Sequence, residues 1–350
     1  MMQRISVKTG SPYEVLIGRG LIADSGKYAL ERVKPCKAAL ITDDSVGALY
    51  GDTVEKSFSE AGFNVCRITV AHGESSKNMD TLSDVLEQLA QNRLTRSDIV
   101  LALGGGMIGD LAGFVAAVYL RGIRFIQLPT SFLAAIDSSV GGKTAVDLKG
   151  GKNLAGAFWQ PEMVICDIDL LGSLTKDIFL DGVGEAVKYG FAFDKELFEM
   201  MAGGIDDKLP EVVARCVSIK SRVVEEDEFD NGERRKLNFG HTFGHAVEHC
   251  SSFSISHGQA VGIGMVIMTR ACVNHGLIGA DALETLISVM KKCGLPTECS
   301  FGAAELCNAA LGDKKRRGNK LHIVVPVTIG ESDMKEIEVA ELESWIASGL

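Results

Sequence analysis

The sequence lacks paired cysteines, long apolar runs and an excess of basic residues. Its nine cysteines include no C-x-x-C pair, which favours reduced, mostly buried thiols in a cytoplasmic protein over a disulfide scaffold. No run of about 18 uncharged apolar residues is present and no apolar stretch follows the charged start, so we expect neither a membrane span nor a signal peptide. The net charge of −10 argues against nucleic acid as a partner, because phosphate backbones need a basic surface.

The composition is that of a globular protein with a large core. The chain has 350 residues and is 46% hydrophobic, which suggests two domains rather than one. Neither an internal repeat nor a low-complexity tract interrupts it. A small anionic ligand stays possible, because a single pocket can be basic on an acidic protein.

Strand-like and helix-like segments alternate in the first half of the chain. Four short apolar runs alternate with stretches whose apolar residues have helical spacing. This βαβα order predicts a parallel sheet covered by helices on both faces. The strand-like runs are Lys37–Asp43, Asn64–Val70, Asp98–Leu103 and Arg124–Pro129, and the helical stretches are Val46–Ala61 and Met79–Leu94.

Helical patterns dominate from Thr175 onward. They cover Pro210–Asp227, Asn238–Cys250, His257–His275 and Ala280–Cys293, and one late strand-like run, Leu321–Val327, is the exception. The sequence therefore predicts an α/β Rossmann-like N-terminal domain over residues 1–170 and an all-α C-terminal domain over residues 171–350.

A glycine-rich turn follows the predicted strand that ends near Leu103. Gly104, Gly106 and Gly109 fit the pattern G-x-G-x-x-G, in which glycines let a pyrophosphate approach the free N–H groups of a helix. A tight turn without a ligand is the alternative. The acidic residue that usually contacts the ribose about 20 residues later is not obvious here.

A second polar stretch runs from Leu128 to Asn153. Gly141-Gly142-Lys143-Thr144 is not a P-loop, because Asp137 stands where the upstream glycine would be. Glycines, hydroxyls and lysines gathered in one stretch suit a phosphorylated or carboxylated ligand. We expect Gly141–Gly156 to be a functional loop, with a solvated surface loop as the alternative.

Histidines mark a third candidate site. His241 and His245 are four residues apart and share a helix face, so spacing alone nominates them as a ligand pair. With Glu185 they could hold a metal ion that keeps an open coordination position. Histidines satisfied by hydrogen bonds are the alternative, and His249 continues the stripe as a packing or surface residue.

These segments, in this order, resemble the 3-dehydroquinate synthase family. The resemblance runs from about Thr42 to Pro326 and is most specific over Arg121–Pro161 and Asn238–Gly264. It implies the family's fold, in which an NAD-binding α/β domain and a helical metal-binding domain border the active-site cleft. It also implies a cytoplasmic homodimer.

The resemblance implies a lyase of the shikimate pathway, which leads to chorismate and the aromatic amino acids. Its substrate would be 3-deoxy-D-arabino-heptulosonate 7-phosphate, and its products 3-dehydroquinate and phosphate. The steps would be transient oxidation by NAD, β-elimination of phosphate, reduction and intramolecular aldol closure. The NAD would be regenerated in each turnover.

The resemblance also assigns the cofactor residues. One zinc or cobalt ion would be bound by Glu185, His241 and His257, whereas His245 would face the substrate. The residues implied to surround NAD are Asp44, Gly73, Glu74, Lys77, Gly105, Gly106, Gly109, Asp110, Thr130, Ser131, Lys143, Lys152, Leu170 and Ser173.

Substrate contacts are implied in the same way. They are Asp137, Lys143, Lys152, Asn153, Lys188, Lys220, Arg234, Asn238, His245 and one of Lys314 and Lys315. Arg121 would reach the phosphate bound in the neighbouring subunit. His245, polarised by Asn238 or Asp137, is the candidate for proton transfer.

Three other functions stay open at this level. Another sugar-phosphate cyclase would make a deoxy-inosose or a valiolone, but Arg234, Asn238 and the pair Lys314-Lys315 favour a substrate that carries a carboxylate. A glycerol-dehydrogenase-like oxidoreductase would accumulate NADH. A non-catalytic NAD-binding module is the third alternative.

Overall fold

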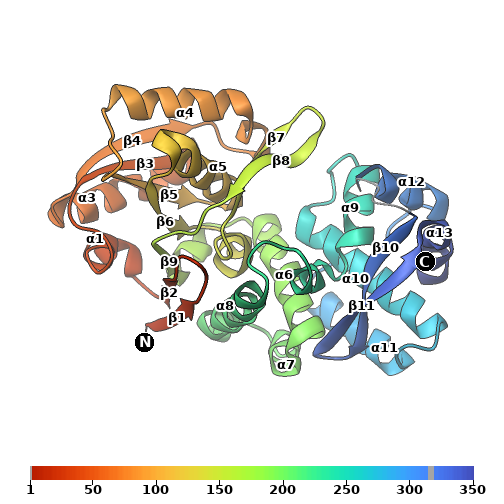
Figure 1. Cartoon of the computed structure of the whole chain (residues 1–350). Coiled ribbons are helices and arrows are strands. Elements are labelled where there is room, and N and C mark those ends of the chain that lie inside the picture. The colour runs from red at the N-terminus through yellow and green to blue at the C-terminus, as the bar shows by residue number, and fades with distance from the viewer. Residues whose placement is uncertain (1, 314–318) are drawn as a thin grey trace. The chain divides into compact units, whose positions relative to one another are not determined.

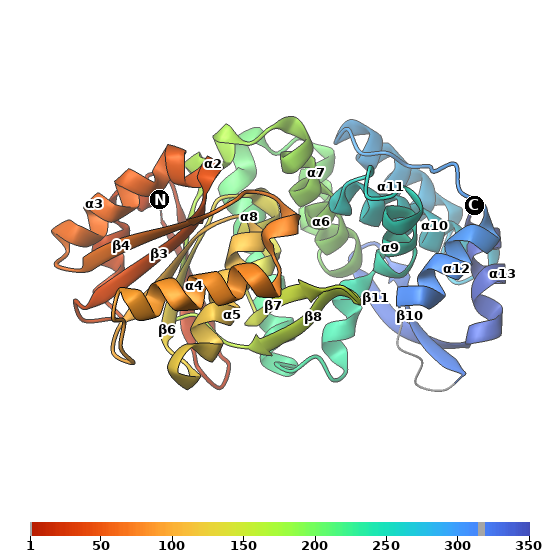
Figure 2. The same cartoon turned by 90° about the horizontal axis from the view of Figure 1, so that it is seen from above.

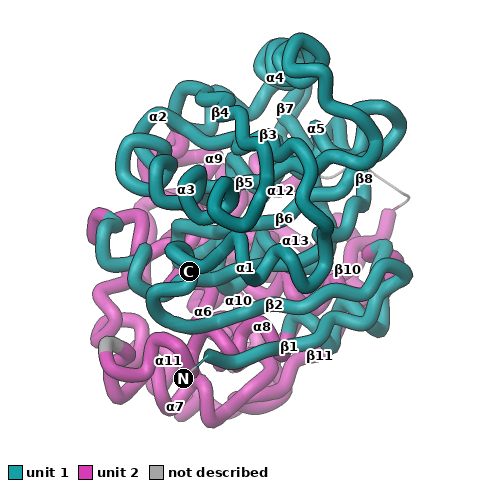
Figure 3. The backbone as a smooth tube through the Cα atoms, turned by 90° about the vertical axis from the view of Figure 1, so that its left-hand side faces the viewer, with its two compact units in different colours: residues 1–174, 220–229 teal, residues 175–219, 230–350 magenta. Residues whose placement is uncertain are grey.

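The computed structural model describes residues 2–313 and 319–350, which form two compact units (Figure 3). Unit 1 comprises Met1–Leu174 with Lys220–Phe229, and unit 2 comprises Thr175–Ile219 with Asp230–Leu350. Helix α8 (Leu209–Glu226) contributes to both units. Among the described residues, no helix combines the length and the apolar character that a membrane span needs.

Unit 1 is built on a seven-stranded sheet. All neighbouring strands are parallel except the first two, which pair antiparallel at one edge. The four predicted strands are confirmed, whereas β1, β2 and β9 were not predicted. In spatial order the strands are β1 (Gln3–Val7), β2 (Tyr13–Gly18), β9 (Met163–Asp167), β6 (Arg124–Pro129), β5 (Ile99–Gly104), β3 (Lys37–Asp43) and β4 (Asn64–Val70).

Helices cover both faces of this sheet, as predicted (Figures 1 and 2). Side chains alternate along a strand, so Ala38 and Leu40 of β3 pack toward one helical layer and Ala39 and Ile41 toward the other. The first layer contains α1 (Ser25–Ala29) and α3 (Asp52–Glu60), and the second contains α4 (Met79–Gln91) and α5 (Gly106–Val118).

The stretch Gly141–Gly156 is not the loop that we expected. It contains most of a hairpin of β7 (Lys143–Leu148) and β8 (Gly151–Phe158), which packs against α5 (Figure 2). Thr144 and Val146 are buried while Lys143 is exposed, and this alternation is that of a strand with one face on the protein. The glycines and lysines of the stretch concealed that pattern.

Unit 2 is mainly helical, and the predicted strand at Leu321–Val327 is confirmed as part of a two-stranded hairpin. The C-terminal unit is therefore not purely α. Its elements are α6 (Lys176–Phe193), α7 (Lys195–Ala202), α9 (His241–Cys250), α10 (His257–Asn274), α11 (Ala280–Lys292), α12 (Ala303–Asp313), β10 (Lys320–Thr328), β11 (Glu331–Glu338) and α13 (Leu342–Gly349).

Glycines set the distance between the three central helices of unit 2. A Cβ on Gly184 of α6 would overlap the carbonyl oxygen of Gly258 in α10. A Cβ on Gly264 of α10 would overlap the carbonyl oxygen of Gly240, which precedes α9. A Cβ on Gly244 of α9 would lie 2.8 Å from the Cα of Val261 in α10. Backbones can approach this closely only where side chains are missing.

We predict that Gly264→Ala will loosen the contact between α9 and α10. Overpacking of a close-packed interior should lower the free energy of unfolding by about 1–3 kcal/mol. Gly312→Ala is the matched control, because it also lies in a helix of unit 2 and no atom of the described residues lies within 4 Å of its added Cβ. Urea unfolding measures both variants, and equal stability of the two would contradict the prediction.

Candidate active site

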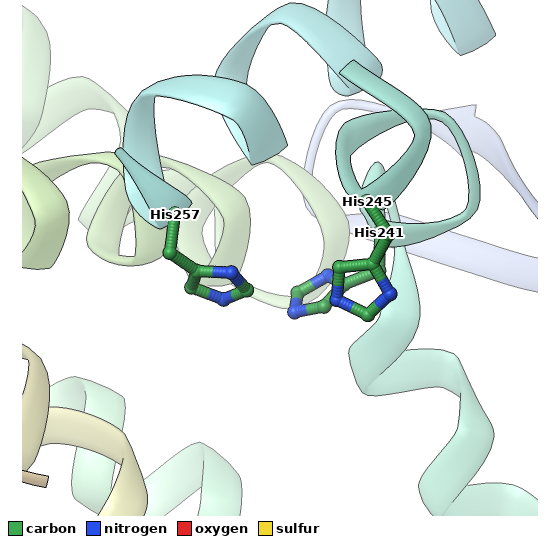
Figure 4. Close-up of side chains that lie close together, drawn as sticks. All are labelled: His241, His245 and His257. Carbon is green, nitrogen blue, oxygen red and sulfur yellow. The ribbon is translucent and has the colours of Figure 1, made fainter. Parts of the chain in front are cut away.

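Three imidazoles from two helices converge in unit 2 (Figure 4). His241 and His245 lie on α9, and His257 is the first residue of α10. One ring nitrogen from each lies within 4.8 Å of the others. His241 and His245, the pair that the spacing predicts, are thus neighbours, and the helix contact through Gly244 and Val261 brings His257 to them.

The carboxylate of Glu185 reaches the same cluster from α6. Its side chain is 0% exposed, and Oε1 lies 3.4 Å from Nε2 of His241 and 3.5 Å from Nε2 of His257. Ligands of one tetrahedral zinc ion stand about 3.3–3.4 Å apart, because each bond is about 2.0–2.1 Å long. A buried carboxylate and two imidazole nitrogens at these separations fit a divalent ion.

Lys188 supplies the positive charge that this buried carboxylate needs. Its Nζ lies 2.5 Å from Oε2 of Glu185, one helical turn away, and both side chains are almost fully buried. Burial alone would raise the pKa of Glu185, but Lys188 and His241 hold that pKa well below its usual range. Glu185 therefore stays ionised, which a role as metal ligand would require.

The two nearest histidines differ in their affinity for protons. Burial lowers the pKa of His241 to about 3, so this ring is neutral at physiological pH. Burial also lowers the pKa of His257, but its hydrogen bonds with Glu185 and Glu248 outweigh that effect and raise this pKa to about 10. A cation bound by both rings would therefore have to displace a proton from His257 but not from His241.

We predict that metal binding near neutral pH releases about one proton per ion, the proton of His257. Because this proton competes with the metal, affinity should fall as the pH drops below the pKa of about 10. Calorimetric titration with zinc in buffers of different ionisation enthalpy measures the release. A binding enthalpy that does not depend on the buffer would contradict the assignment.

In unit 1, most residues assigned to NAD follow the carboxyl ends of neighbouring parallel strands. Asp44 follows β3, Gly73 lies beyond β4, Gly105 follows β5, Thr130 follows β6 and Leu170 lies beyond β9. These strands are consecutive in the sheet, so the segments share one edge. Ligands of doubly wound α/β proteins bind at this edge.

The glycine turn after β5 divides into two parts. Gly104 and Gly109 serve packing, because a Cβ would crowd Ile108 in the first case and Gln127 in the second. Gly105 and Gly106 face the hydroxyls of other segments instead: the nearest atoms to an added Cβ would be Oγ of Ser131 and Oγ of Ser138, respectively. α5 begins here without a side-chain cap, and Gly105 has extended backbone angles. The first N–H groups of α5 therefore receive no hydrogen bond from a side-chain cap and are available to an anion.

Other assigned residues of this edge hold one another by ion pairs. The buried Lys77 lies 2.7 Å from Oε1 of Glu74 and 3.2 Å from Oδ2 of Asp110. Burial raises the pKa of Asp110 to about 6 although Lys77 opposes the shift. Asp44 is exposed and contacts Nδ1 of His72 at 2.8 Å, and Oγ of Ser173 donates to the carbonyl of Leu170.

The residues assigned to substrate in unit 1 fall into two groups. Lys220 and Asp137 are together: the buried ammonium donates to the carbonyl oxygen of Asp137 at 2.6 Å and also to its carboxylate. The second group, at exposed positions, consists of Lys143, Lys152 and Asn153 on the hairpin and Arg121 after α5. Asn153 (φ 54°) and Arg121 (φ 69°) both have left-handed backbones.

In unit 2, Arg234 is 2% exposed within the 3₁₀ helix Glu233–Asn238, and Asn238 ends that helix at an exposed position. Lys314 and Lys315 lie outside the described residues. The individual roles assigned to these side chains stay predictions.

Two carboxylates close to the histidines were not predicted. Oε2 of Glu248 lies 3.3 Å from Nδ1 of His257, and Asp181 of α6 accepts the N–H of Gly258 at 2.9 Å. Glu248 could have been found from its spacing, since it lies seven residues after His241 on the same helix face. Asp181 gave no signal, because its partner is far away in the sequence.

Two solved structures share this architecture along their whole length. One is 2-deoxy-scyllo-inosose synthase complexed with carbaglucose-6-phosphate, NAD+ and Co2+, with a TM-score of 0.88, 23% identity and 100% of both chains covered. The other is 2-epi-5-epi-valiolone synthase from Streptomyces hygroscopicus subsp. jinggangensis 5008 with NAD+ and Zn2+ bound, with a TM-score of 0.87, 24% identity and 99% of both chains covered. The chain thus shares the fold of these two synthases.

Comparison at the level of sequence identifies the family. The profile of the 3-dehydroquinate synthase N-terminal domain matches residues 67–181, and that of the C-terminal domain matches residues 182–316. A 3-dehydroquinate synthase from Streptococcus suis (strain 05ZYH33) is 43% identical over 344 residues, which cover 96% of this chain and 97% of the relative. The chain belongs to the 3-dehydroquinate synthase family, as the sequence analysis expected.

Proposed function

We propose that the chain converts 3-deoxy-D-arabino-heptulosonate 7-phosphate to 3-dehydroquinate and phosphate, as a phosphate-eliminating carbon–oxygen lyase. Full-length similarity to synthases of this name supports the activity. The observation that carries it at the level of chemistry is the buried Glu185 carboxylate, which faces two imidazole nitrogens at 3.4 and 3.5 Å.

The cofactors follow from the two groups of residues. Glu185, His241 and His257 would hold one zinc or cobalt ion, and the strand ends of unit 1 with the α5 N-terminus would hold NAD. When bound, NAD would accept and return a hydride while the ion polarises substrate oxygen. His245 stands beside the proposed ligands, its ring centroid 5.3 Å from that of His241, and would transfer protons there.

The remaining residues would bind and orient the anionic substrate. Arg234 presents a planar guanidinium that suits the substrate carboxylate, and Lys143, Lys152 and Asn153 would contact substrate from the hairpin. Lys220 fixes Asp137 by hydrogen bonds to its backbone and side chain. We propose a homodimer in which Arg121 reaches the phosphate of the neighbouring subunit.

The substrate assignment is tested by release of inorganic phosphate from purified protein with zinc and NAD. We expect release from the heptulosonate phosphate without net formation of NADH, because the hydride returns to the product. Turnover only with glucose 6-phosphate or a heptulose 7-phosphate would assign another cyclase activity. Stoichiometric accumulation of NADH would instead assign a dehydrogenase.

The hairpin lysines provide a sharper test. We predict that Lys152→Ala leaves the fold intact and lowers kcat/KM by at least about 100-fold, since it removes a cation that would stabilise the leaving phosphate. Lys149→Ala is the matched control, because Lys149 is an exposed lysine at the turn of the same hairpin. Equal rates for the two variants would assign Lys152 to the solvated surface.

A further inference from the structure

We infer that Glu248 is a positioning residue, which orients the imidazole of His257 so that Nε2 is presented to the metal ion. The inference deepens the proposed function and rests on it, because it concerns one of the proposed ligands. Glu248 itself would touch neither metal nor substrate. Its contribution would be to fix which nitrogen of the ring is free to bind.

The two nitrogens of His257 face two different carboxylates. Nε2 lies 3.5 Å from Oε1 of Glu185, and Nδ1 lies 3.3 Å from Oε2 of Glu248. A neutral imidazole carries one N–H and one lone pair. When Glu248 accepts the N–H of Nδ1, the lone pair is left on Nε2, on the side of Glu185. Carboxylates commonly hold ligating histidines in this way.

His241 provides an internal comparison. Its Nε2 also faces Oε1 of Glu185, and its Nδ1 lies 3.2 Å from the backbone carbonyl of Phe239. Both rings thus present Nε2 to the same place and have an acceptor behind Nδ1. The acceptor behind His241 is fixed by the main chain, whereas the acceptor behind His257 is a side chain that a substitution can remove.

The location of His257 explains why its ring needs a partner. It is the first residue of α10, and its side chain is 32% exposed compared with 13% for His241. Glu248 lies near the end of α9 with a side chain only 12% exposed. Its backbone carbonyl accepts hydrogen bonds from N of Phe253 and from Oγ of Ser251, each at 2.9 Å. The residue thus holds both the segment that leads to α10 and the ring at its start.

The test measures zinc affinity of the full chain by competition with a chelator at fixed pH. We expect Glu248→Ala to weaken zinc binding roughly 10–100-fold, the usual effect of losing such a partner. Glu248→Gln should lose less, because its amide oxygen still accepts the N–H but carries no charge. Visible absorption of the Co2+-loaded protein should change in Glu248→Ala, because the ligand geometry around the ion changes.

Thr269→Val is the control for a purely structural effect. Thr269 is buried in α10, and its hydroxyl donates to the carbonyl of Met265. The variant should lose stability without losing zinc affinity. The inference is overturned if Glu248→Ala binds zinc within about twofold of the parent, or if Thr269→Val loses as much affinity.

Three further outcomes are distinguishable. If Glu248→Ala does not fold, Glu248→Met decides, because its side chain has a similar size but no oxygen to accept the N–H, and parental affinity in that variant overturns the inference. A parent chain that binds no zinc would overturn the proposed metal site and this inference with it. If the parent binds zinc and the Glu248 variant that lacks the acceptor binds it equally tightly, this inference alone is overturned.

Discussion

The close approach of three helices in unit 2 is the constraint on which the candidate metal centre depends. Each candidate ligand has a glycine as its chain neighbour: Gly184 precedes Glu185, Gly240 precedes His241, Gly244 precedes His245 and Gly258 follows His257. These glycines lie where α6, α9 and α10 pack backbone against backbone. Because these glycines let the helices approach closely, the polar side chains next to them in the sequence come together from separate segments.

This packing also explains how the protein tolerates a buried carboxylate. Glu185 is fully buried, and an unpaired charge there would cost several kcal/mol. Lys188 compensates it from within the same helix, and His241 and His257 face its other oxygen. Because the pKa of His257 is raised to about 10, its ring is protonated near neutral pH when no cation is bound, and it supplies a second positive charge. If the proposed divalent ion replaces this proton, the net charge of the cluster rises by one unit rather than two.

The sheet and its helices could be predicted because their signals are local. Apolar runs such as Lys37–Asp43 and Arg124–Pro129 match the observed strands at both ends. The strand β9 was missed because its partners β2 and β6 are distant in sequence. The edge strands β1 and β2 pair with each other across a short connection, so their signal was local and was overlooked. The hairpin after Gly142 was mistaken for a loop, since its glycines and lysines concealed the alternation of Thr144 and Val146.

The candidate NAD turn of unit 1 and the candidate metal centre of unit 2 differ in the same way. Phosphate-binding turns depend on main-chain N–H groups at strand ends, so Gly105 and its neighbours could be located from one strand and one turn. A metal centre needs side chains from several elements, and spacing reveals only pairs on one helix. It therefore favoured His241 with His245 and added Glu185 as a possible third ligand, whereas His257 came from family resemblance. The glycine beside each of the four residues is a local signal for a helix contact. These glycines indicate that the segments lie together, which the residue spacing within one helix cannot show.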